Sequence, residues 1–353
     1  MMKVFVTGGA GFIGSNLLQL LVPRYPDHHF VNVDKLTYAA NPASLSNLEA
    51  LGNYALEVVD IADREAVEAL YAKHEPTLVI HLAAESHVDK SILGPEVFIQ
   101  TNVLGTFNLL EGFKKHSMAK DGALFHHVST DEVYGSLGDT GLFTEQTRYD
   151  PSSPYSASKA SSDHLVRAYG RTYDLPFKLT NCSNNYGPRQ FPEKLIPLMI
   201  LNAVERKPLP IYGEGLNVRD WLYVTDHCEA IWAVIERGTL GETYNIGGNS
   251  EKRNVDVVHA LIDIVADETG APLDELKGLI TYVQDRPGHD HRYAIDATRI
   301  AEECDWRASE TFESGMRKTV KWYLDNTQWV EQVRSGEYLK WIEDNYGDRL
   351  AAR

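Results

Sequence analysis

Over its first 185 or so residues, the chain alternates short apolar runs with longer amphipathic runs. The short runs predict strands at 3–7, 29–34, 55–60, 78–83, 124–130 and 177–182. The longer runs carry apolar residues at helical spacing and predict helices within 15–22, 64–74, 101–116 and 155–173. Nearly continuous apolar strands separated by helices indicate a parallel sheet covered on both faces. The pattern therefore predicts a doubly wound α/β domain.

The pattern changes after Gly187, where Pro-rich connections and mixed elements replace the regular alternation. A strand-like run at 242–248 stands between helical patterns and can return to the first sheet. We expect the first domain to comprise 1–186, rejoined by 222–250 and by a C-terminal helix at 318–345. The remaining segments, 187–221 and 251–317, are expected to form a smaller, mixed α/β domain that binds the substrate.

Composition adds that this is an ordinary globular chain. Its 353 residues suffice for about two domains, and 43% hydrophobic with 24% charged residues is typical of soluble proteins. Cys182, Cys228 and Cys304 are isolated, which indicates neither a disulfide framework nor a zinc site. No signal-peptide pattern and no long apolar run occurs, so secretion and membrane spanning are not expected. We expect reduced thiols in the cytoplasm.

The net charge narrows the range of partners. A formal charge of -16 repels nucleic acid over most of the surface, and no basic stripe interrupts it. We therefore expect a small-molecule partner, with neither nucleic acid nor a membrane bound.

A glycine-rich motif directly follows the first predicted strand. TGGAGFIG opens a helix there, with Gly9, Gly11 and Gly14 in G-x-G-x-x-G spacing and Gly8 in an overlapping set. Such glycines allow a tight turn and let the helix N-terminus approach a pyrophosphate. Asp34, about 20 residues further on, can accept hydrogen bonds from a ribose 2′-OH, which favours NAD over NADP. The pattern predicts a Rossmann domain that binds NAD; the alternative for Asp34 is a solvated strand-end residue.

YSASK places Tyr155 and Lys159 four residues apart in a predicted helix, so both side chains lie on one face. A nearby cation shifts a pKa by roughly 1 to 3 units, so a Tyr with a pKa near about 10 can become a base close to neutrality. Alone, this spacing is common on exposed helix faces. Behind a dinucleotide fingerprint, it favours Tyr155 as a base, with Lys159 as its activator and a contact for the nicotinamide ribose.

Together, TGGAGFIG, the Tyr/Lys pair and NCSNNYGP resemble the extended short-chain dehydrogenase/reductase superfamily, whose members rework nucleotide sugars. Within it, TDEVYG, LAAESHVDKSI, NNYGPRQFPEKLIPL, RDWLYVTDHCEAI and DRPGHDHRYAID are similar to the dTDP-glucose 4,6-dehydratases. The resemblance covers essentially the whole chain. It implies a lyase that converts dTDP-glucose to dTDP-4-keto-6-deoxyglucose by internal hydride transfer through tightly bound NAD, as in rhamnose-type biosynthesis.

The resemblance also implies catalytic roles for Asp131 and Glu132, two adjacent acids at the end of a predicted strand. Oxidation at C4 of the sugar acidifies C5, so Glu132 can remove the C5 proton while a protonated Asp131 protonates the departing C6 hydroxyl. Two adjacent carboxyls cannot both ionise cheaply, which divides the pair into acid and base. Thr130 is expected to hydrogen-bond the C4 oxygen. The alternative for Asp131 and Glu132 is a solvated loop after the strand. Their position argues against it, because ligands of open parallel sheets bind at the carboxyl ends of the strands.

Further cofactor contacts follow from the motifs. Asp60 and Ile61 come after the third strand, where an adenine edge can be read, although Asp60 alone is also a common turn residue. Small residues ending the fourth strand let backbone approach the cofactor, and Thr101 otherwise reads as a helix N-cap. The expected cofactor residues are Gly8, Gly11, Phe12, Ile13, Gly14, Asp34, Lys35, Thr37, Asp60, Ile61, Leu82, Ala83, Ala84, Ser86, Thr101, Tyr155, Lys159 and Asn185.

The resemblance implies a nucleotide-sugar site as well. Arg219 and Arg286 suit a diphosphate because charge-assisted hydrogen bonds are roughly twice as strong as neutral ones. Arg189 stands where relatives commonly carry an aromatic residue or His, which leaves the structure of its loop open. HDH at 289–291 lacks further ligands at metal spacing, so no metal is expected. The expected substrate residues are Ser86, Thr130, Asn184, Glu193, Lys194, Leu195, Pro210, Ile211, Tyr212, Arg219, Asn254, Asp285, Arg286 and His289.

Two other functions stay open at this stage. A 4-epimerase or decarboxylase acting on a UDP- or CDP-sugar shares the Tyr/Lys pair but usually lacks the Asp-Glu pair. A non-catalytic NAD-binding protein would be expected to have lost these residues. No single residue separates thymine from uracil. Family members dimerise through paired helices, here expected at 101–116 and 155–173, so a homodimer is expected.

Overall fold

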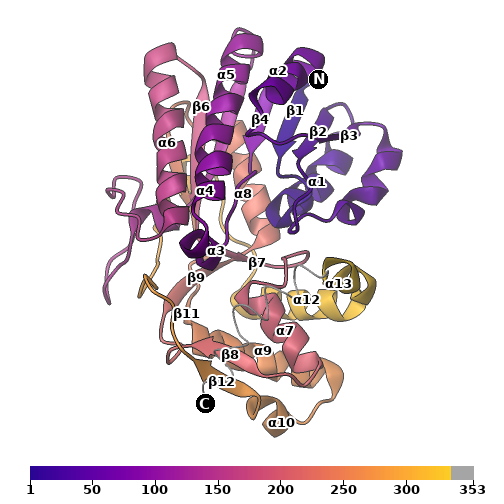
Figure 1. Cartoon of the computed structure of the whole chain (residues 1–353), viewed down its shortest axis with the longest axis vertical. Coiled ribbons are helices and arrows are strands. Elements are labelled where there is room, and N and C mark those ends of the chain that lie inside the picture. Colours follow the sequence, from indigo (N-terminus) through magenta and orange to yellow (C-terminus); the bar gives the residue numbers. More distant parts are fainter. Residues whose placement is uncertain (335–353) are drawn as a thin grey trace.

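The computed structural model describes residues 1–334, and its centre is a seven-stranded sheet in the order β10-β6-β5-β4-β1-β2-β3 (Figure 1). The strands are β1 Lys3–Thr7, β2 His29–Asp34, β3 Tyr54–Val58, β4 Leu78–His81, β5 Leu124–Thr130, β6 Phe177–Cys182 and β10 Thr243–Ile246. All pairings within this sheet are parallel. The predicted doubly wound α/β fold is confirmed.

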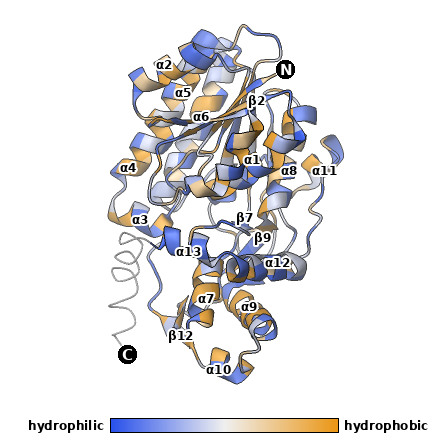
Figure 2. Cartoon of the chain, turned by 90° about the vertical axis from the view of Figure 1, so that its right-hand side faces the viewer, coloured by the Kyte–Doolittle hydropathy of each residue, from blue (hydrophilic) through white to orange (hydrophobic). Residues whose placement is uncertain are grey.

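Helices cover both faces of this sheet because successive strand residues point to opposite sides. Val4 and Val6 of β1 pack into one core with the apolar sides of α1 and α8, whereas Phe5 packs into the other with α2, α5 and α6. Figure 2 shows the apolar strands enclosed between these helices. The covering helices are α1 Phe12–Arg24, α2 Arg64–His74, α5 Thr106–His116, α6 Pro154–Tyr173 and α8 Val224–Arg237.

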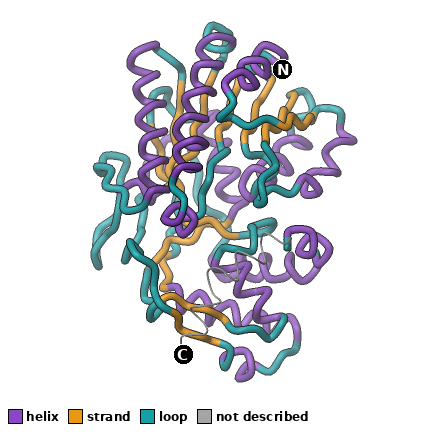
Figure 3. The backbone as a smooth tube through the Cα atoms, viewed as in Figure 1, coloured by secondary structure: helices purple, strands orange, loops and turns teal. Residues whose placement is uncertain are grey.

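A second, smaller part lies beyond the carboxyl ends of the strands, below the sheet in Figure 3. It contains a three-stranded sheet, β11-β9-β7, and a two-stranded sheet, β12-β8. Its elements are β7 Asn184–Tyr186, α7 Leu195–Val204, β8 Leu209–Tyr212, β9 Val218–Tyr223, β11 Glu251–Arg253, α9 Asn254–Thr269, α10 Leu273–Lys277, β12 Ile280–Val283, α12 Phe312–Asp325 and α13 Thr327–Val333. These elements bury a core of their own.

The C-terminal helix differs from its expected placement. Met316, Val320 and Tyr323 of α12 are buried in the core of the second part, with residues of α7 and α9, and do not cover the large sheet. Apolar residues at helical spacing predict that one face of the helix is buried, but they do not specify the core against which it packs. Residues 335–345 of the expected helix 318–345 lie outside the described residues.

The remaining elements lie in the connections between the strands and helices described above. They are η1 Pro42–Leu51, α3 Val88–Leu93, α4 Glu96–Phe98, the π-helical η2 Ile99–Gly105, η3 Asp131–Tyr134 and α11 Thr298–Glu303. Over residues 1–334, none of the helices combines the length and the apolarity needed to cross a membrane.

Local sequence fixes where α6 begins. Ser153 Oγ accepts a hydrogen bond from the Ser156 backbone N–H at 3.1 Å, Ser156 Oγ accepts from the Ser153 N–H at 3.0 Å, and Pro154 takes the first helical position. This reciprocal cap satisfies donors that a helix start otherwise leaves unpaired. Tyr155 therefore lies in the first turn of α6, and Lys159 follows one turn later.

Candidate active site

A cavity of about 310 Å³ opens between the carboxyl ends of the central strands and the segment 183–194. All of the cofactor residues expected from the sequence line it except Asp60. Asp60 instead accepts a hydrogen bond from the Ala62 N–H at 2.9 Å and lies 3.7 Å from Lys35 Nζ, which makes it a turn residue beside the cavity.

The glycine loop forms one wall of the cavity with no space for side chains. Gly8 has φ +71°, and a Cβ there would lie 2.8 Å from the Ala83 backbone; a Cβ on Gly14 would lie 2.2 Å from the Gly8 carbonyl oxygen. Gly11 precedes α1, whose N-terminus has neither a side-chain cap nor an acidic residue in its first turn. Its free N–H groups thus suit a bound pyrophosphate.

Asp34 is buried and organises this loop from the end of β2. Its Oδ2 accepts a hydrogen bond from the Ala10 N–H at 2.9 Å, and its Oδ1 accepts one from the Leu36 N–H at 2.8 Å. Burial raises the pKa of Asp34, while these two bonds oppose the rise. A carboxylate oxygen has two lone pairs, so Asp34 retains acceptors for ribose hydroxyls.

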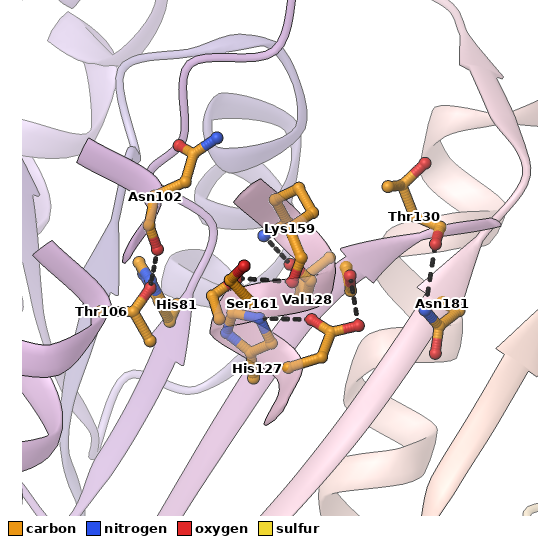
Figure 4. A network of polar contacts seen from close by, with 12 residues as sticks. His81, Asn102, Thr106, His127, Val128, Thr130, Lys159, Ser161 and Asn181 are labelled. Atoms are coloured by element: carbon orange, nitrogen blue, oxygen red, sulfur yellow. Dashed lines mark hydrogen bonds and ion pairs between the residues drawn. The ribbon is translucent and has the colours of Figure 1, made fainter. Parts of the chain in front are cut away.

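Tyr155 and Lys159 project from α6 toward the end of β5. Lys159 Nζ donates to the Val128 carbonyl oxygen at 2.9 Å (Figure 4). Burial raises the pKa of Tyr155 well above its usual value and Glu132 adds to the rise, whereas a hydrogen bond with Thr130 lowers it. Burial also lowers the pKa of Lys159. Lysine alone therefore does not make the phenol a base, and the positive charge of a bound nicotinamide would have to contribute.

A buried pair that sequence reasoning missed stands one helical turn beyond the lysine. Asp163 Oδ1 lies 3.0 Å from His127 Nε2, and Asp163 Oδ2 accepts from Ser129 Oγ at 2.8 Å and Tyr149 OH at 2.9 Å. Burial opposes ionisation of Asp163, but the bond from His127 and the charge of Lys159 hold its pKa below the usual value. Its spacing, four residues after Lys159, was the available signal.

Asp131 and Glu132 begin η3 directly after β5, and their surroundings differ. Asp131 is 1% exposed, and burial, reinforced by Glu132, raises its pKa well above the usual value. Burial also raises the pKa of Glu132, but Arg286, Lys194 and Arg219 oppose that rise. The environment thus favours a neutral Asp131, while three cations favour the ionised form of Glu132.

Free acceptors in the cavity indicate a polar ligand. Within residues 1–334, Asp131 Oδ2 and Asn184 Oδ1 are buried without a hydrogen-bond partner, and both residues line the cavity. Asn185 is oriented by two contacts: its Nδ2 donates a hydrogen bond to the Ser183 carbonyl oxygen at 3.0 Å, and His227 Nδ1 lies 2.9 Å from its Oδ1. His227 is a second residue that sequence reasoning did not single out.

The structure divides the expected substrate residues into two groups. Ser86, Thr130, Asn184, Glu193 and Lys194 line the cavity. The others do not line it and belong mainly to the second part of the chain: Leu195, Pro210, Ile211, Tyr212, Arg219, Asn254, Asp285, Arg286 and His289.

Some of this second group gathers around Asp89. Its carboxylate accepts from Tyr212 OH at 3.2 Å and pairs with Arg286 Nη1 at 3.4 Å. His289 Nδ1 lies 2.7 Å from Asp285 Oδ1, and its ring meets that of Tyr212 edge-on with centroids 6.1 Å apart. By contrast, Leu195 and Asn254 are the first residues of α7 and α9.

Arg189, whose loop the sequence left open, ties the two parts of the chain together. It has φ +67°, its Nη1 donates to Asn16 Oδ1 at 3.2 Å, and its guanidinium lies 5.8 Å from the Trp322 ring centroid. Asn16 in turn donates to the Pro188 carbonyl at 2.9 Å. In the described part of the chain, no His, Cys, Asp or Glu side chains form a cluster of metal-ligand type.

A parallel sheet with an N-terminal glycine loop, and a Tyr/Lys pair on one helix at its carboxyl edge, define a dinucleotide-binding protein of the short-chain dehydrogenase/reductase class. A sequence model described as GDP-mannose 4,6 dehydratase matches residues 5–319. The chain belongs to this family.

Named relatives agree with that assignment. The chain is 56% identical to a dTDP-glucose 4,6-dehydratase of Shigella flexneri, over 99% of this chain and 100% of that protein. It is also 56% identical to one of Neisseria meningitidis, over 96% and 98%.

Solved structures show the same similarity. The chain matches the crystal structure of a dTDP-glucose 4,6-dehydratase from Bacillus anthracis with NAD (TM-score 0.83, 46% identity). It also matches that of a dTDP-glucose 4,6-dehydratase from Streptomyces venezuelae with NAD and a second ligand (TM-score 0.86, 43% identity). Each match covers 94% of this chain and 100% of the other. A UDP-glucose 4-epimerase of Thermotoga maritima also matches, at 27% identity and TM-score 0.82, over 92% of this chain and 100% of that one.

The buried pair beside Lys159 gives a first prediction. We expect Asp163→Asn to lower the free energy of unfolding by about 3 kcal/mol, because Lys159 loses its buried counter-charge. Tyr149→Phe removes only one hydrogen bond to Asp163 and should cost about 1 kcal/mol. Urea titration of both variants measures their free energies of unfolding. Equal decreases in the two variants would contradict a charge role for Asp163.

His227 gives a prediction about pH. Burial lowers its pKa to about 3, whereas an unfolded chain binds a proton there near pH 6.5, so its contribution to stability is complete above pH 6.5 and is lost as pH falls toward 3. Between pH 7 and 5, the free energy of unfolding of His227→Asn should fall by about 2 kcal/mol less than that of wild type. His291→Asn, at an exposed position, is the control, and its free energy of unfolding should fall between pH 7 and 5 as much as that of wild type. An equal fall in His227→Asn would contradict this role of His227.

Proposed function

We propose that the protein is an NAD-dependent lyase that dehydrates dTDP-glucose to dTDP-4-keto-6-deoxyglucose, as the names of its relatives state for them. The observation that carries the proposal is the unequal carboxyl pair Asp131 and Glu132 at the end of β5, lining one cavity with Tyr155. Elimination of water from a sugar needs one group to remove a proton and another to donate one, and this pair supplies both.

NAD fits the observed cavity: the uncapped start of α1 suits its pyrophosphate, Asp34 suits a ribose, and Lys159 suits the ribose of nicotinamide. Bound there, NAD would supply the hydride chemistry between C4 and C6 of the sugar without an external oxidant, and its positive charge would lower the pKa of the Tyr155 phenol.

The chain's own residues move the protons. Tyr155 takes the C4 hydroxyl proton during oxidation, and Thr130 hydrogen-bonds the C4 oxygen. Glu132 then removes the C5 proton, which the new C4 ketone has acidified, while Asp131 gives its proton to the departing C6 hydroxyl. Glu132 finally returns a proton to C5. The charges of Arg286, Lys194 and Arg219 favour the ionised form of Glu132, which the first of its two steps requires.

The nucleotide is assigned to the second part of the chain. Arg219 and Arg286 are proposed to bind the diphosphate, with Tyr212 and His289 near the base and ribose. The proposed domain boundaries are 186/187, 221/222 and 250/251. The charges on these arginines act on Glu132, which supports their position beside the reacting sugar.

We further propose a cytoplasmic homodimer. Leu93, Val97, Ile99 and Leu104 expose large apolar side chains along α3–η2, next to α5 and α6. Exposed apolar side chains that gather on neighbouring elements mark an interaction surface. A second copy presenting the same helices would bury them.

A 4-epimerase is the second candidate, favoured by the similarity to UDP-glucose 4-epimerase. Incubating the purified protein with dTDP-, UDP- and CDP-glucose, without added NAD, separates the two. We expect a 4-keto-6-deoxy product from dTDP-glucose at least about tenfold faster than from the others. A 4-epimer as product would establish the second candidate, and absence of any product would overturn the proposal.

Glu132→Gln tests the role of the base. With dTDP-glucose in deuterated water, the variant should still oxidise C4, seen as reduced-cofactor absorbance, but should exchange no deuterium into C5, because no base reaches that proton. Glu145→Gln removes a partly buried carboxylate outside the cavity and serves as the control, with exchange retained. Deuterium at C5 in Glu132→Gln, measured by mass spectrometry, would exclude Glu132 as the base.

A further inference from the structure

Two segments that are far apart in the sequence form walls of the cavity. The first is the loop 35–41 after β2, which contributes Lys35, Thr37, Ala39 and Ala40. The second is 190–194 before α7, which contributes Gln190, Phe191, Glu193 and Lys194. The expected cofactor residues include Lys35 and Thr37 of the first wall and Asn185, close in sequence to the second. NAD held by these residues therefore lies between the two walls.

Glu193 joins the second wall to the first through direct side-chain contacts. Its Oε1 accepts a hydrogen bond from Tyr38 OH at 3.2 Å, and its Oε2 lies 3.1 Å from Lys90 Nζ on α3. Lys90 Nζ also lies 3.2 Å from the centroid of the Tyr38 ring. Each of the three side chains thus contacts the other two. We refer to Tyr38, Lys90 and Glu193 together as the latch.

Burial makes the latch costly to open. The Glu193 side chain is 3% exposed, so its carboxylate needs a paired cation and a hydrogen-bond donor. Lys90 supplies the cation, Tyr38 supplies the donor, and a cation over an aromatic ring adds a further attraction. Glu193 was expected among the substrate residues, but both of its carboxylate oxygens are engaged in the latch. Separation of the walls would break all three contacts together.

The latch acts on the middle of the loop 35–41, because both ends of this loop are fixed. At its start, the Leu36 N–H donates to Asp34 Oδ1 at 2.8 Å. At its end, the Asn41 N–H donates to the Ala10 carbonyl oxygen of the glycine loop at 3.0 Å. Tyr38 lies between these two anchors, and its ring meets that of Phe191 edge-on with centroids 5.4 Å apart. The middle of the loop is thus the part held by the second wall.

We propose that the latch is a kinetic barrier that retains NAD in the cavity, an inference that deepens the proposed function and rests on it for its purpose. The proposed reaction requires the reduced cofactor to stay in place between oxidation at C4 and reduction at C6. The latch contacts join protein to protein, so they oppose entry of NAD as much as its release. The latch therefore slows exchange of NAD without adding to its affinity.

Tyr38→Phe and Lys90→Met test the latch from two different elements, and neither residue lines the cavity. The purified protein with its NAD is mixed with excess isotopically labelled NAD, and mass spectrometry follows the replacement of the bound cofactor. We expect exchange to be about tenfold faster in each variant, because each loses a contact with a buried carboxylate. Equilibrium dialysis of the same proteins should show that the Kd for NAD changes by less than about twofold.

Matched controls lie outside the cavity. Tyr25→Phe loses a hydrogen bond from Tyr25 OH to Glu236 Oε1 of 3.3 Å, and Lys73→Met loses an ion pair with Glu57 of 2.6 Å. Both control variants should exchange NAD at the wild-type rate. Exchange accelerated equally in the controls and in the latch variants would overturn the latch, because the effect would then not depend on the two walls.

Turnover gives a second reading. With dTDP-glucose, and with pyruvate and lactate dehydrogenase as a trap for reduced cofactor that leaves the protein, Lys90→Met should form lactate and wild type almost none. With saturating NAD and no trap, kcat of Lys90→Met should equal that of wild type, because Lys90 does not line the cavity. Equal lactate formation in the two proteins would count against the latch.

The outcomes separate the latch from the function on which it rests. Unchanged exchange in both latch variants overturns the latch, and so does faster release with an equal loss of affinity, since these side chains would then stabilise bound NAD. The exchange assay contains no sugar. A wild type that exchanges NAD slowly but makes no 4-keto-6-deoxy product overturns the proposed function alone, whereas product with unchanged exchange in the variants overturns the latch alone. A wild type that binds no NAD overturns both.

Discussion

The unequal burial of two neighbouring carboxyls is the constraint on which this site depends. Asp131 is buried at the end of β5, while Glu132, one residue later, remains partly exposed, and the positive charges of three side chains lower its pKa against the effect of burial. A buried, neutral carboxyl can donate a proton, whereas an ionised one can accept one. The tight turn of η3, closed by the Thr130 side chain, holds the two groups in this relation. If both were equally solvated, neither would keep its role.

A single helix supplies most of the rest of the chemistry. Tyr155, Lys159 and Asp163 are spaced by four residues on α6, so they form a line from the cavity into the protein. Asp163 is tied to β5 by His127 and Ser129, which fixes α6 against the strand that carries the acids. Thr130, the last residue of β5, donates a hydrogen bond to Asp131 Oδ1 at 3.4 Å. The base, its cation and the acid pair thus share one helix–strand contact.

Sequence pattern predicted those parts whose signals are local. Parallel strands read as continuous apolar runs, and the glycine loop and the Tyr/Lys spacing depend on a few neighbouring residues. Asp163 and His127 were missed because each alone resembles an ordinary polar residue; only the pairing of β5 with α6 makes them a buried pair. The packing of α12 in the second core could not be predicted from the sequence pattern either, since an apolar helix face does not specify what it packs against.

The nucleotide residues show the same limit from another side. Arg219 and Arg286 were named from a resemblance, and no local signal gives their distance from the reacting groups. Their effect on Glu132 follows from how β9 and the loop after β12 are folded against the sheet, which depends on many distant contacts. Conversely, Asp60 fitted a motif by spacing but lies beside the cavity, because its carboxylate closes a turn of its own.

The most direct measurement of this account is infrared spectroscopy of the carboxyl groups at neutral pH in the wild type, Asp131→Asn and Glu132→Gln. Unequal burial predicts the carbonyl band of a protonated carboxyl in the wild type and in Glu132→Gln, and its loss in Asp131→Asn. A wild type without that band, or a band that disappears with Glu132 and persists without Asp131, would contradict the division of the pair into a neutral acid and an ionised base.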